Sequence, residues 1–187
     1  MGARAVYLAS RDARFLQQRR ERCFGGMRFR FYSDFTLLYK ALAPEEGPAL
    51  RMKPADDTNW SLFMAMHNEA FSEVPNAETM DEAALWRLRN GRCEAGFLLY
   101  GGAPCGTYVL DFSERRPEIA AVALLEAYRG RGWGHMAMRA LERRLLESGA
   151  PEAQLLLASA NEAAGALYHA RGYRSLRRIS RWFQLLD

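Results

Sequence analysis

Residues 127–134 read AYRGRGWG, and the interpretation of the whole sequence depends on this stretch. It follows the apolar run IAAVALL at 119–125 and precedes HMAMRALERRLLES at 135–148, whose apolar residues recur with helical spacing. The pattern predicts a strand, a turn of small residues with two arginines, and a helix start. Unpaired N–H groups at a helix start attract anions, and glycine lets an anion approach them closely. The local pattern leaves a phosphate-binding turn and a purely structural turn equally open.

Two well-known phosphate-binding patterns do not fit this turn. The pattern GxxxxGK[ST] needs a lysine after its last glycine, whereas His135 follows Gly134. The dinucleotide pattern GxGxxG fails because Gly130 and Gly132 are followed by His135 at the third position.

The composition is that of one ordinary globular domain. The chain has 187 residues, of which 49% are hydrophobic and 26% charged. Its longest apolar run, 119–125, is far shorter than the roughly 20 residues of a membrane helix, and the N-terminal stretch is not typical of a secretory signal. We therefore expect a cytoplasmic protein without membrane contact. Three scattered cysteines without CxxC spacing predict neither a disulfide framework nor a zinc site, and a net charge of +4 suits an anionic ligand without requiring nucleic acid.

The remaining elements alternate between strand and helix. Before the turn, the patterns predict a helix at 11–22, strands at 27–35, 36–42 and 49–55, a helix at 57–71 capped by Asp57 or Thr58, a helix at 79–89 opened by a capping box of Thr79 and Glu82, and a hairpin over 95–112. The strand 118–125 is expected to be buried on both faces. After the turn come a helix at 134–148, a strand at 153–159, a helix at 161–171 and one or two strands at 173–186. This order predicts an α/β fold with a mixed sheet.

Three segments of the sequence resemble motifs of a known family. Arg129-x-x-Gly132-x-Gly134 is similar to the Gln/Arg-x-x-Gly-x-Gly/Ala motif of the GNAT superfamily of acyl-CoA N-acyltransferases. SANEAAGALYHARGY at 159–173 is similar to the family's Asn, small residues, LY and GF or GY, and GGAPCGTYVL at 101–110 resembles its hairpin between the second and third strands. The resemblance covers about residues 50–187 and implies a central twisted mixed sheet flanked by helices.

The resemblance implies acetyl-CoA as co-substrate. Its pyrophosphate would bind the backbone amides of the turn, which carries over to Arg129, Gly130, Arg131, Gly132, Trp133 and Gly134, with His135 at the helix start. The side chains of Arg129 and Arg131 could add charge-assisted hydrogen bonds. Val122, Ala123 and Leu124 would present backbone groups to the pantetheine arm and to the thioester carbonyl. Asn161 would bond the cofactor arm, cap the next helix, or do both.

The resemblance also implies an acid and a base. Tyr168 resembles the family's general acid, and the alternative is an aromatic residue of the core. Glu118 is the first candidate for the base, with a solvated carboxylate as the alternative; Glu126 or an ordered water could serve instead. We expect His67, His135 and His169 at the surface or at helix ends, because they lack metal-ligand spacing.

These features predict transfer of an acetyl group from acetyl-CoA to a primary amine of an unidentified acceptor. Direct attack in a ternary complex is expected because no cysteine has an identifiable histidine partner. A non-catalytic acyl-CoA-binding sensor or scaffold is the alternative. The acceptor cleft is expected to be walled by aromatic residues from 60–89 and 174–186, namely Trp60, Phe63, Trp86, Trp182 and Phe183.

Three features of the sequence have more than one interpretation. Residues 1–49 are expected to be an N-terminal extension, or a remnant of, or swap with, a second unit like 50–187, and a homodimer is left open. The arginines at 171, 174, 177, 178 and 181 are expected to form a solvated sheet edge rather than a patch for an acidic substrate, the adenosine phosphate of CoA or nucleic acid. Trp133 is larger than the aliphatic residue often found in the motif, and it either packs beneath the turn or narrows the cofactor slot.

Overall fold

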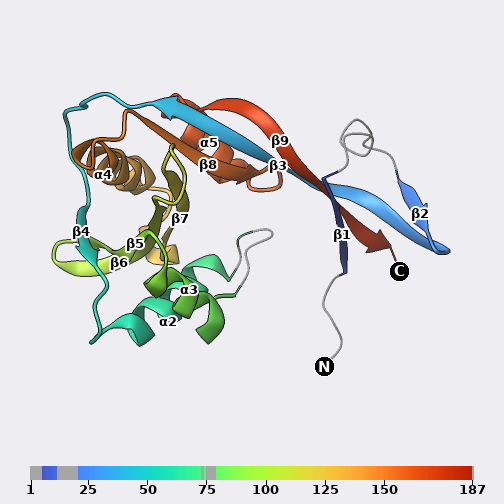
Figure 1. Cartoon of the computed structure of the whole chain (residues 1–187), viewed down its shortest axis with the longest axis horizontal. Helices are drawn as coiled ribbons and strands as arrows, with labels where there is room; N and C mark the ends of the chain where they lie inside the picture. The colour runs from blue at the N-terminus through green and yellow to red at the C-terminus, as the bar shows by residue number, and fades with distance from the viewer. Residues whose placement is uncertain (1–5, 12–20, 73, 75–78, 187) are drawn as a thin grey trace. The chain divides into compact units, whose positions relative to one another are not determined.

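The computed structural model describes residues 6–11, 21–72, 74 and 79–186 (Figure 1). The chain divides into two compact units. Unit 1 comprises Met1–Leu38 and Leu156–Asp187, and unit 2 comprises Tyr39–Leu155. Strands β3 (Met27–Ala41) and β8 (Glu152–Ala158) contribute residues to both units.

Unit 2 is built on a mixed sheet. Its strands follow the order β8-β7-β6-β5-β4, in which β7 pairs with β8 in parallel and all other neighbours are antiparallel. The further strands are β4 (Arg51–Pro54), β5 (Cys93–Tyr100), β6 (Ala103–Asp111) and β7 (Glu118–Leu124). The helices are α2 (Trp60–Phe71), α3 (Glu82–Asn90), the short 3-10 helix η1 (Glu126–Tyr128) and α4 (Trp133–Glu147). The predicted α/β fold with a mixed sheet is confirmed.

The two faces of this sheet are covered by different helices. Helices α2 and α3 lie on one face and α4 on the other (Figure 1). Phe63, Met66 and Leu85 of the first pair pack against alternate residues of β5 and β6, among them Phe97 and Val109. This alternation follows the two-residue period of a strand, so each face of the hairpin contacts its own helix layer.

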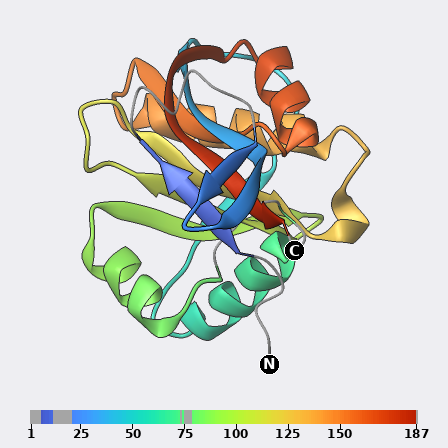
Figure 2. The same ribbon diagram turned by 90° about the vertical axis from the view of Figure 1, so that its right-hand side faces the viewer.

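Unit 1 holds the two ends of the chain that the structure describes. It contains β1 (Tyr7–Ser10), β2 (Arg22–Phe24), α5 (Glu162–Ala170) and β9 (Arg174–Leu186). β9 lies beside β3 and pairs with β1 in antiparallel register, and β2 forms a hairpin with β3 (Figure 2).

Several predicted details are wrong. The runs at 27–35 and 36–42 form the single strand β3, and β7 is only partly buried, with Ile119 as its one fully buried residue. Asn59 rather than Asp57 or Thr58 precedes α2, because Asp56 and Thr58 form a turn upstream. Asp81 caps α3 in place of Thr79, accepting a hydrogen bond from the Ala84 amide. Most of the helix predicted at 11–22 lies outside the described residues; of its residues only 11, 21 and 22 are described, and Arg22 begins β2.

Gly106 on β6 is required by the close approach of β7. A Cβ built there would lie 2.3 Å from the Ala123 carbonyl oxygen and 2.9 Å from Leu124 Cδ2. We expect Gly106→Ala to lower the free energy of unfolding by about 1–3 kcal/mol, because the strands must separate. Urea unfolding measures this change.

Gly165 in α5 is the matched control. A Cβ there would make ordinary contact with Leu157, 3.5 Å away, so Gly165→Ala should be neutral or stabilise by up to about 1 kcal/mol. Equal stability of Gly106→Ala and wild type would contradict the close approach of the two strands.

Candidate functional site

The turn between η1 and α4 offers a row of free backbone donors. Gly130 and Gly132 have φ values of +73° and +79°, and nothing lies within 4 Å of the Cβ position of either. Within the described residues, the amides of Gly130, Arg131, Gly132, Trp133 and Gly134 have no backbone acceptor, whereas the next amide, of His135, bonds to the Gly132 carbonyl. Consecutive free N–H groups around left-handed residues form a concave anion site, and α4 adds the positive end of its dipole.

Arg129 fixes the entrance of this turn from the protein side. Its Nε donates to the Leu124 carbonyl at 2.9 Å, and its Nη2 donates to the Ala70 carbonyl at the end of α2 at 2.8 Å. The guanidinium is therefore aimed at the protein's own backbone. Both arginines are exposed, but the guanidinium of Arg129 is bonded to two backbone carbonyls, so the side chain of Arg131 can turn toward an anion on the turn more readily.

The backbone of β7 has one edge bonded to β6 and one edge facing away from it. The Leu125 amide donates to Cys105, so the alternating pattern of an antiparallel pair directs the groups of Ala123 toward β6 and those of Val122 and Leu124 away. Pairing between β7 and β8 is confined to Glu118 and Gln154. Among the predicted strand residues, Val122 and Leu124 can thus present backbone groups to a ligand, whereas Ala123 cannot, because its groups hold β6.

Glu118 opens β7 at the end remote from the turn. Six residues separate it from Leu124, which corresponds to about 20 Å along a strand. Burial, with a contribution from Asp111 across the β6–β7 ladder, raises the pKa of its carboxyl, while a hydrogen bond with Gln154 opposes that shift. A raised pKa makes this carboxylate a stronger base than an exposed one.

Asn161 and Tyr168 belong to unit 1, at the start and toward the end of α5. The Asn161 side chain accepts a hydrogen bond from the Ala164 amide, so its capping role is confirmed. Tyr168 is 9% exposed, and burial raises its pKa to about 12, so the phenol keeps its proton at neutral pH. Its ring lies 6.0 Å from that of Tyr173.

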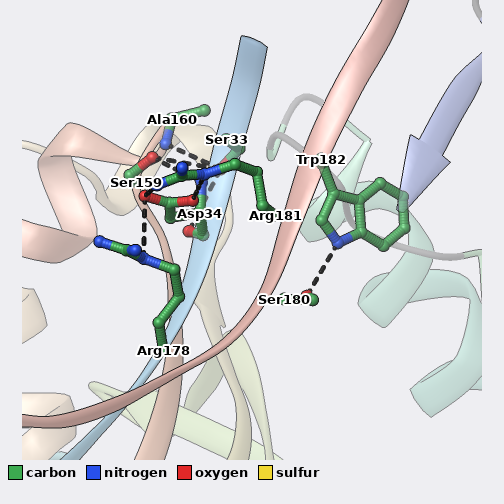
Figure 3. Close-up of polar contacts among 8 residues, drawn as sticks. All are labelled: Ser33, Asp34, Ser159, Ala160, Arg178, Ser180, Arg181 and Trp182. Atoms are coloured by element: carbon green, nitrogen blue, oxygen red, sulfur yellow. Dashed lines mark hydrogen bonds and ion pairs between the residues drawn. The ribbon is translucent and has the colours of Figure 1, made fainter. Parts of the chain in front are cut away.

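A buried ion pair holds the loop from which α5 begins (Figure 3). Arg181 Nε and Nη2 donate to the two carboxylate oxygens of Asp34 at 2.6 and 2.8 Å, and Arg178 Nε lies 3.2 Å from the second oxygen. The Asp34 backbone exchanges hydrogen bonds with Ser159, whose amide donates to the Asp34 carbonyl and whose Oγ accepts from the Asp34 amide. The Ala160 amide donates to Ser33 Oγ at 3.3 Å. The two residues before Asn161 are thus bonded to β3.

The expectation of a solvated arginine edge is therefore wrong for two of its members. Arg181 is 1% exposed and Arg171 is 8% exposed, whereas Arg174, Arg177 and Arg178 are exposed. Arg181 is buried because it pairs with Asp34, a single carboxylate inside the long strand β3. Asp34 was not predicted from the sequence, although a single acid in the run FRFYSDFTLLY at 29–39 is the signal that could have revealed it.

The aromatic residues expected to wall an acceptor cleft do not share one role. Phe63 and Phe183 are fully buried in the cores of their units. Trp60 and the 65% exposed Trp86 line a cavity of about 540 Å³ in unit 2, together with Ala55, Asp56, Asp57, Arg89 and Asn90.

Comparison with known proteins decides the family. The profile of the acetyltransferase (GNAT) family matches residues 60–173, more than half of the chain. The chain belongs to this family. Over 151 residues it is 30% identical to a mycothiol acetyltransferase of Corynebacterium efficiens, which covers 68% of this chain and 51% of the relative. The chain thus spans about half the length of that curated relative.

Solved structures show the same fold. An acetyltransferase from Thermus thermophilus superposes with a TM-score of 0.57 at 21% identity, covering 74% of this chain and 97% of that one. The ribosomal-protein-S18-alanine N-acetyltransferase from Escherichia coli gives 0.58 at 16% identity, with coverages of 72% and 92%. A GCN5-related N-acetyltransferase from Kribbella flavida gives 0.57 at 20% identity, with coverages of 87% and 61%.

Two further properties of the described residues bear on other kinds of site. None of the helices in this part of the chain has the length and apolar character needed to cross a membrane. Within the same residues, no three His, Cys, Asp or Glu side chains are grouped so that they could hold a metal ion.

His67 is buried in the middle of α2, so the expected surface or helix-end position is wrong for this histidine. Its ring stacks on Phe71 at 4.5 Å, and no hydrogen-bond partner of its Nδ1 lies among the described residues. Burial lowers the pKa of His67 from 6.5 to about 4. The folded protein therefore holds the imidazole neutral at pH values where the unfolded chain protonates it.

This shift predicts a pH-dependent stability. The contribution of His67 is fully present above about pH 6.5 and is lost as the pH falls toward 4, because the unfolded chain binds the proton first. Between pH 7 and pH 5 the loss amounts to about 2 kcal/mol. Urea unfolding of wild type and His67→Phe at both pH values measures it, since phenylalanine keeps the ring and removes the titration. An identical change in both proteins would contradict the assignment.

Proposed function

We propose that this chain transfers an acetyl group from acetyl-CoA to a primary amine by direct attack in a ternary complex. The observation that carries the proposal is the row of five free amides from Gly130 to Gly134, in a chain of the acetyltransferase (GNAT) family. A pyrophosphate has the charge and the acceptor oxygens that such a row of donors binds.

The free edge of β7 is assigned to the acyl end of the cofactor. Val122 has an N–H and a C=O directed away from β6, and Leu124 has an N–H, since its carbonyl is bonded to Arg129. Amide-like groups of the pantetheine arm can pair with such an edge. An N–H of this edge that meets the thioester carbonyl stabilises the negative charge that develops on the oxygen during attack.

Acyl transfer needs a proton removed from the amine and one delivered to the leaving sulfur. The amine nitrogen bonds to the carbonyl carbon, the carbon–sulfur bond breaks, and the sulfur leaves with the bonding electron pair. We assign Tyr168 as the donor of the proton to the sulfur, because it occupies the tyrosine position of the segment 159–173 that resembles the family motif and its phenol is protonated at neutral pH. Glu118 or an ordered water accepts the proton of the amine, and the raised pKa of Glu118 favours it over the exposed Glu126.

The relatives' names do not fix the acceptor. One names mycothiol and another the alanine of ribosomal protein S18, so the acceptors of the two differ. The acceptor panel therefore includes small amines, a peptide N-terminus, lysine and aminoglycosides.

Binding and turnover test the proposal directly. Calorimetry with acetyl-CoA should show binding by the wild-type chain, and release of the CoA thiol should follow with at least one amine. Gly132→Ala should weaken acetyl-CoA binding about tenfold or more, because its Cβ points into the open side of the turn. Absence of acetyl-CoA binding by the wild type would refute the proposal, and binding without turnover across the panel would favour a sensor or scaffold.

Gly149, which follows the C-cap Ser148 of α4, supplies the matched control for the turn variant. It has a similar φ of +85° and open space at its Cβ position, so Gly149→Ala carries the same backbone strain of about 1–2 kcal/mol. Both variants should lose similar stability, and only Gly132→Ala should lose acetyl-CoA affinity. Equal losses of affinity would show that the effect comes from strain alone.

The role of Tyr168 is tested by its hydroxyl group. Tyr168→Phe should lower kcat about 100-fold with little change in acetyl-CoA affinity, because a general acid acts only in the chemical step. Tyr173→Phe, the neighbouring buried tyrosine, should stay within about threefold of wild type. An unchanged kcat for Tyr168→Phe in steady-state assays would remove this residue from the mechanism.

A further inference from the structure

The indole of Trp133 is packed against two tyrosines at the exit of the glycine turn. Its ring centroid lies 4.5 Å from that of Tyr100 with the planes 28° apart, and 4.8 Å from that of Tyr128 with the planes 38° apart. No ring contact joins the two tyrosines to each other within the described part of the chain, so each packs against the indole separately. The guanidinium carbon of Arg131 lies 5.9 Å from the indole centroid.

These three rings come from three different segments of unit 2. Tyr100 is the last residue of β5, directly before the hairpin turn Gly101–Gly102, Tyr128 ends η1, and Trp133 begins α4. The stack therefore ties the first residue of α4 to the β5–β6 hairpin and to the segment before the turn. Offset aromatic pairs of this kind stabilise beyond their buried area.

Contacts of this kind restrict the otherwise flexible backbone of the turn. Glycine has more conformational freedom than any other residue, and nothing lies within 4 Å of the Cβ position of Gly130 or Gly132. Arg129 fixes the entrance through the carbonyls of Leu124 and Ala70. Without an anchor at the exit, the five free amides from Gly130 to Gly134 would have to be ordered when a ligand binds, at a cost in affinity.

We propose that Trp133, packed against Tyr100 and Tyr128, is the positioning residue that pre-organises this turn for phosphate binding. The inference rests on the proposed function, since it assigns the phosphates of CoA to the turn. The indole acts through the position of its own backbone amide and of its neighbours. The indole ring is held by side chains of the protein itself, because two tyrosine rings pack against it and the guanidinium of Arg131 lies over it.

Affinity for CoA, measured by calorimetry, tests the anchor. Trp133→Leu should raise the Kd for CoA about tenfold, and Trp133→Phe, which keeps a ring in the stack, should raise it less than threefold. Trp86→Leu is the matched control, because Trp86 is 65% exposed and lies on α3, and its Kd for CoA should stay at the wild-type value.

Tyr100→Ser distinguishes a role of the aromatic stack in holding the turn from stacking of the adenine base on the indole. It also tests the proposal if Trp133→Leu does not fold. Tyr100 is 46% exposed at the end of a hairpin strand, where the fold tolerates substitution. Its loss should weaken CoA binding about fivefold, and the double variant with Trp133→Leu should lose little more than Trp133→Leu alone, since both act through one stack.

Three results would overturn the proposal. They are a wild-type Kd for Trp133→Leu, an unchanged or improved Kd for Tyr100→Ser, which frees a face of the indole, and full additivity of the two variants. Failure of the wild-type chain to bind CoA would instead refute the proposed function, on which this inference depends.

Discussion

The carboxylate of Asp34 is the group on which the C-terminal part of unit 1 depends. Both of its oxygens are bonded by Arg181, and both ions are almost completely removed from solvent. Loss of one partner from such a pair commonly costs about 3–5 kcal/mol, because the other charge stays buried without compensation. The same Asp34 backbone holds Ser159, so the ion pair, the end of β8 and the start of α5 form one bonded assembly.

In unit 2 the candidate site depends on a glycine-rich turn and not on a buried ion pair. The turn after η1 needs glycine, because only glycine accepts the left-handed backbone at Gly130 and Gly132 without strain and leaves the amides open. Glycine also increases the conformational freedom of the backbone, so a rigid binding turn requires contacts that restrict it. Arg129 and Trp133 lie at the two ends of the turn. The guanidinium of Arg129 is bonded to α2, and the indole of Trp133 packs against Tyr100 and Tyr128. The arginine of the family motif thus acts here through backbone carbonyls.

Much of the fold and part of the site could be predicted because they depend on neighbours in the sequence. The β5–β6 hairpin follows from two glycines between alternating strands, and α4 follows from its apolar spacing. Asn161 as a helix cap follows from the local preference of asparagine. Predictions failed where a partner far along the chain decides. Arg181 is buried by Asp34, 147 residues away, and the backbone groups of Ala123 are held by β6.

The sequence by itself determined the order of strands and helices from residue 49 onward, the glycine turn and the motif that places the chain in its family. These properties are set by backbone preferences and short-range periodicity, which a linear string records. Only the tertiary structure decided which edge of β7 is free, which arginine is buried and what Trp133 contacts. Each of these depends on register and packing between segments that are distant in sequence, and a difference of one residue in register changes the face on which a side chain lies.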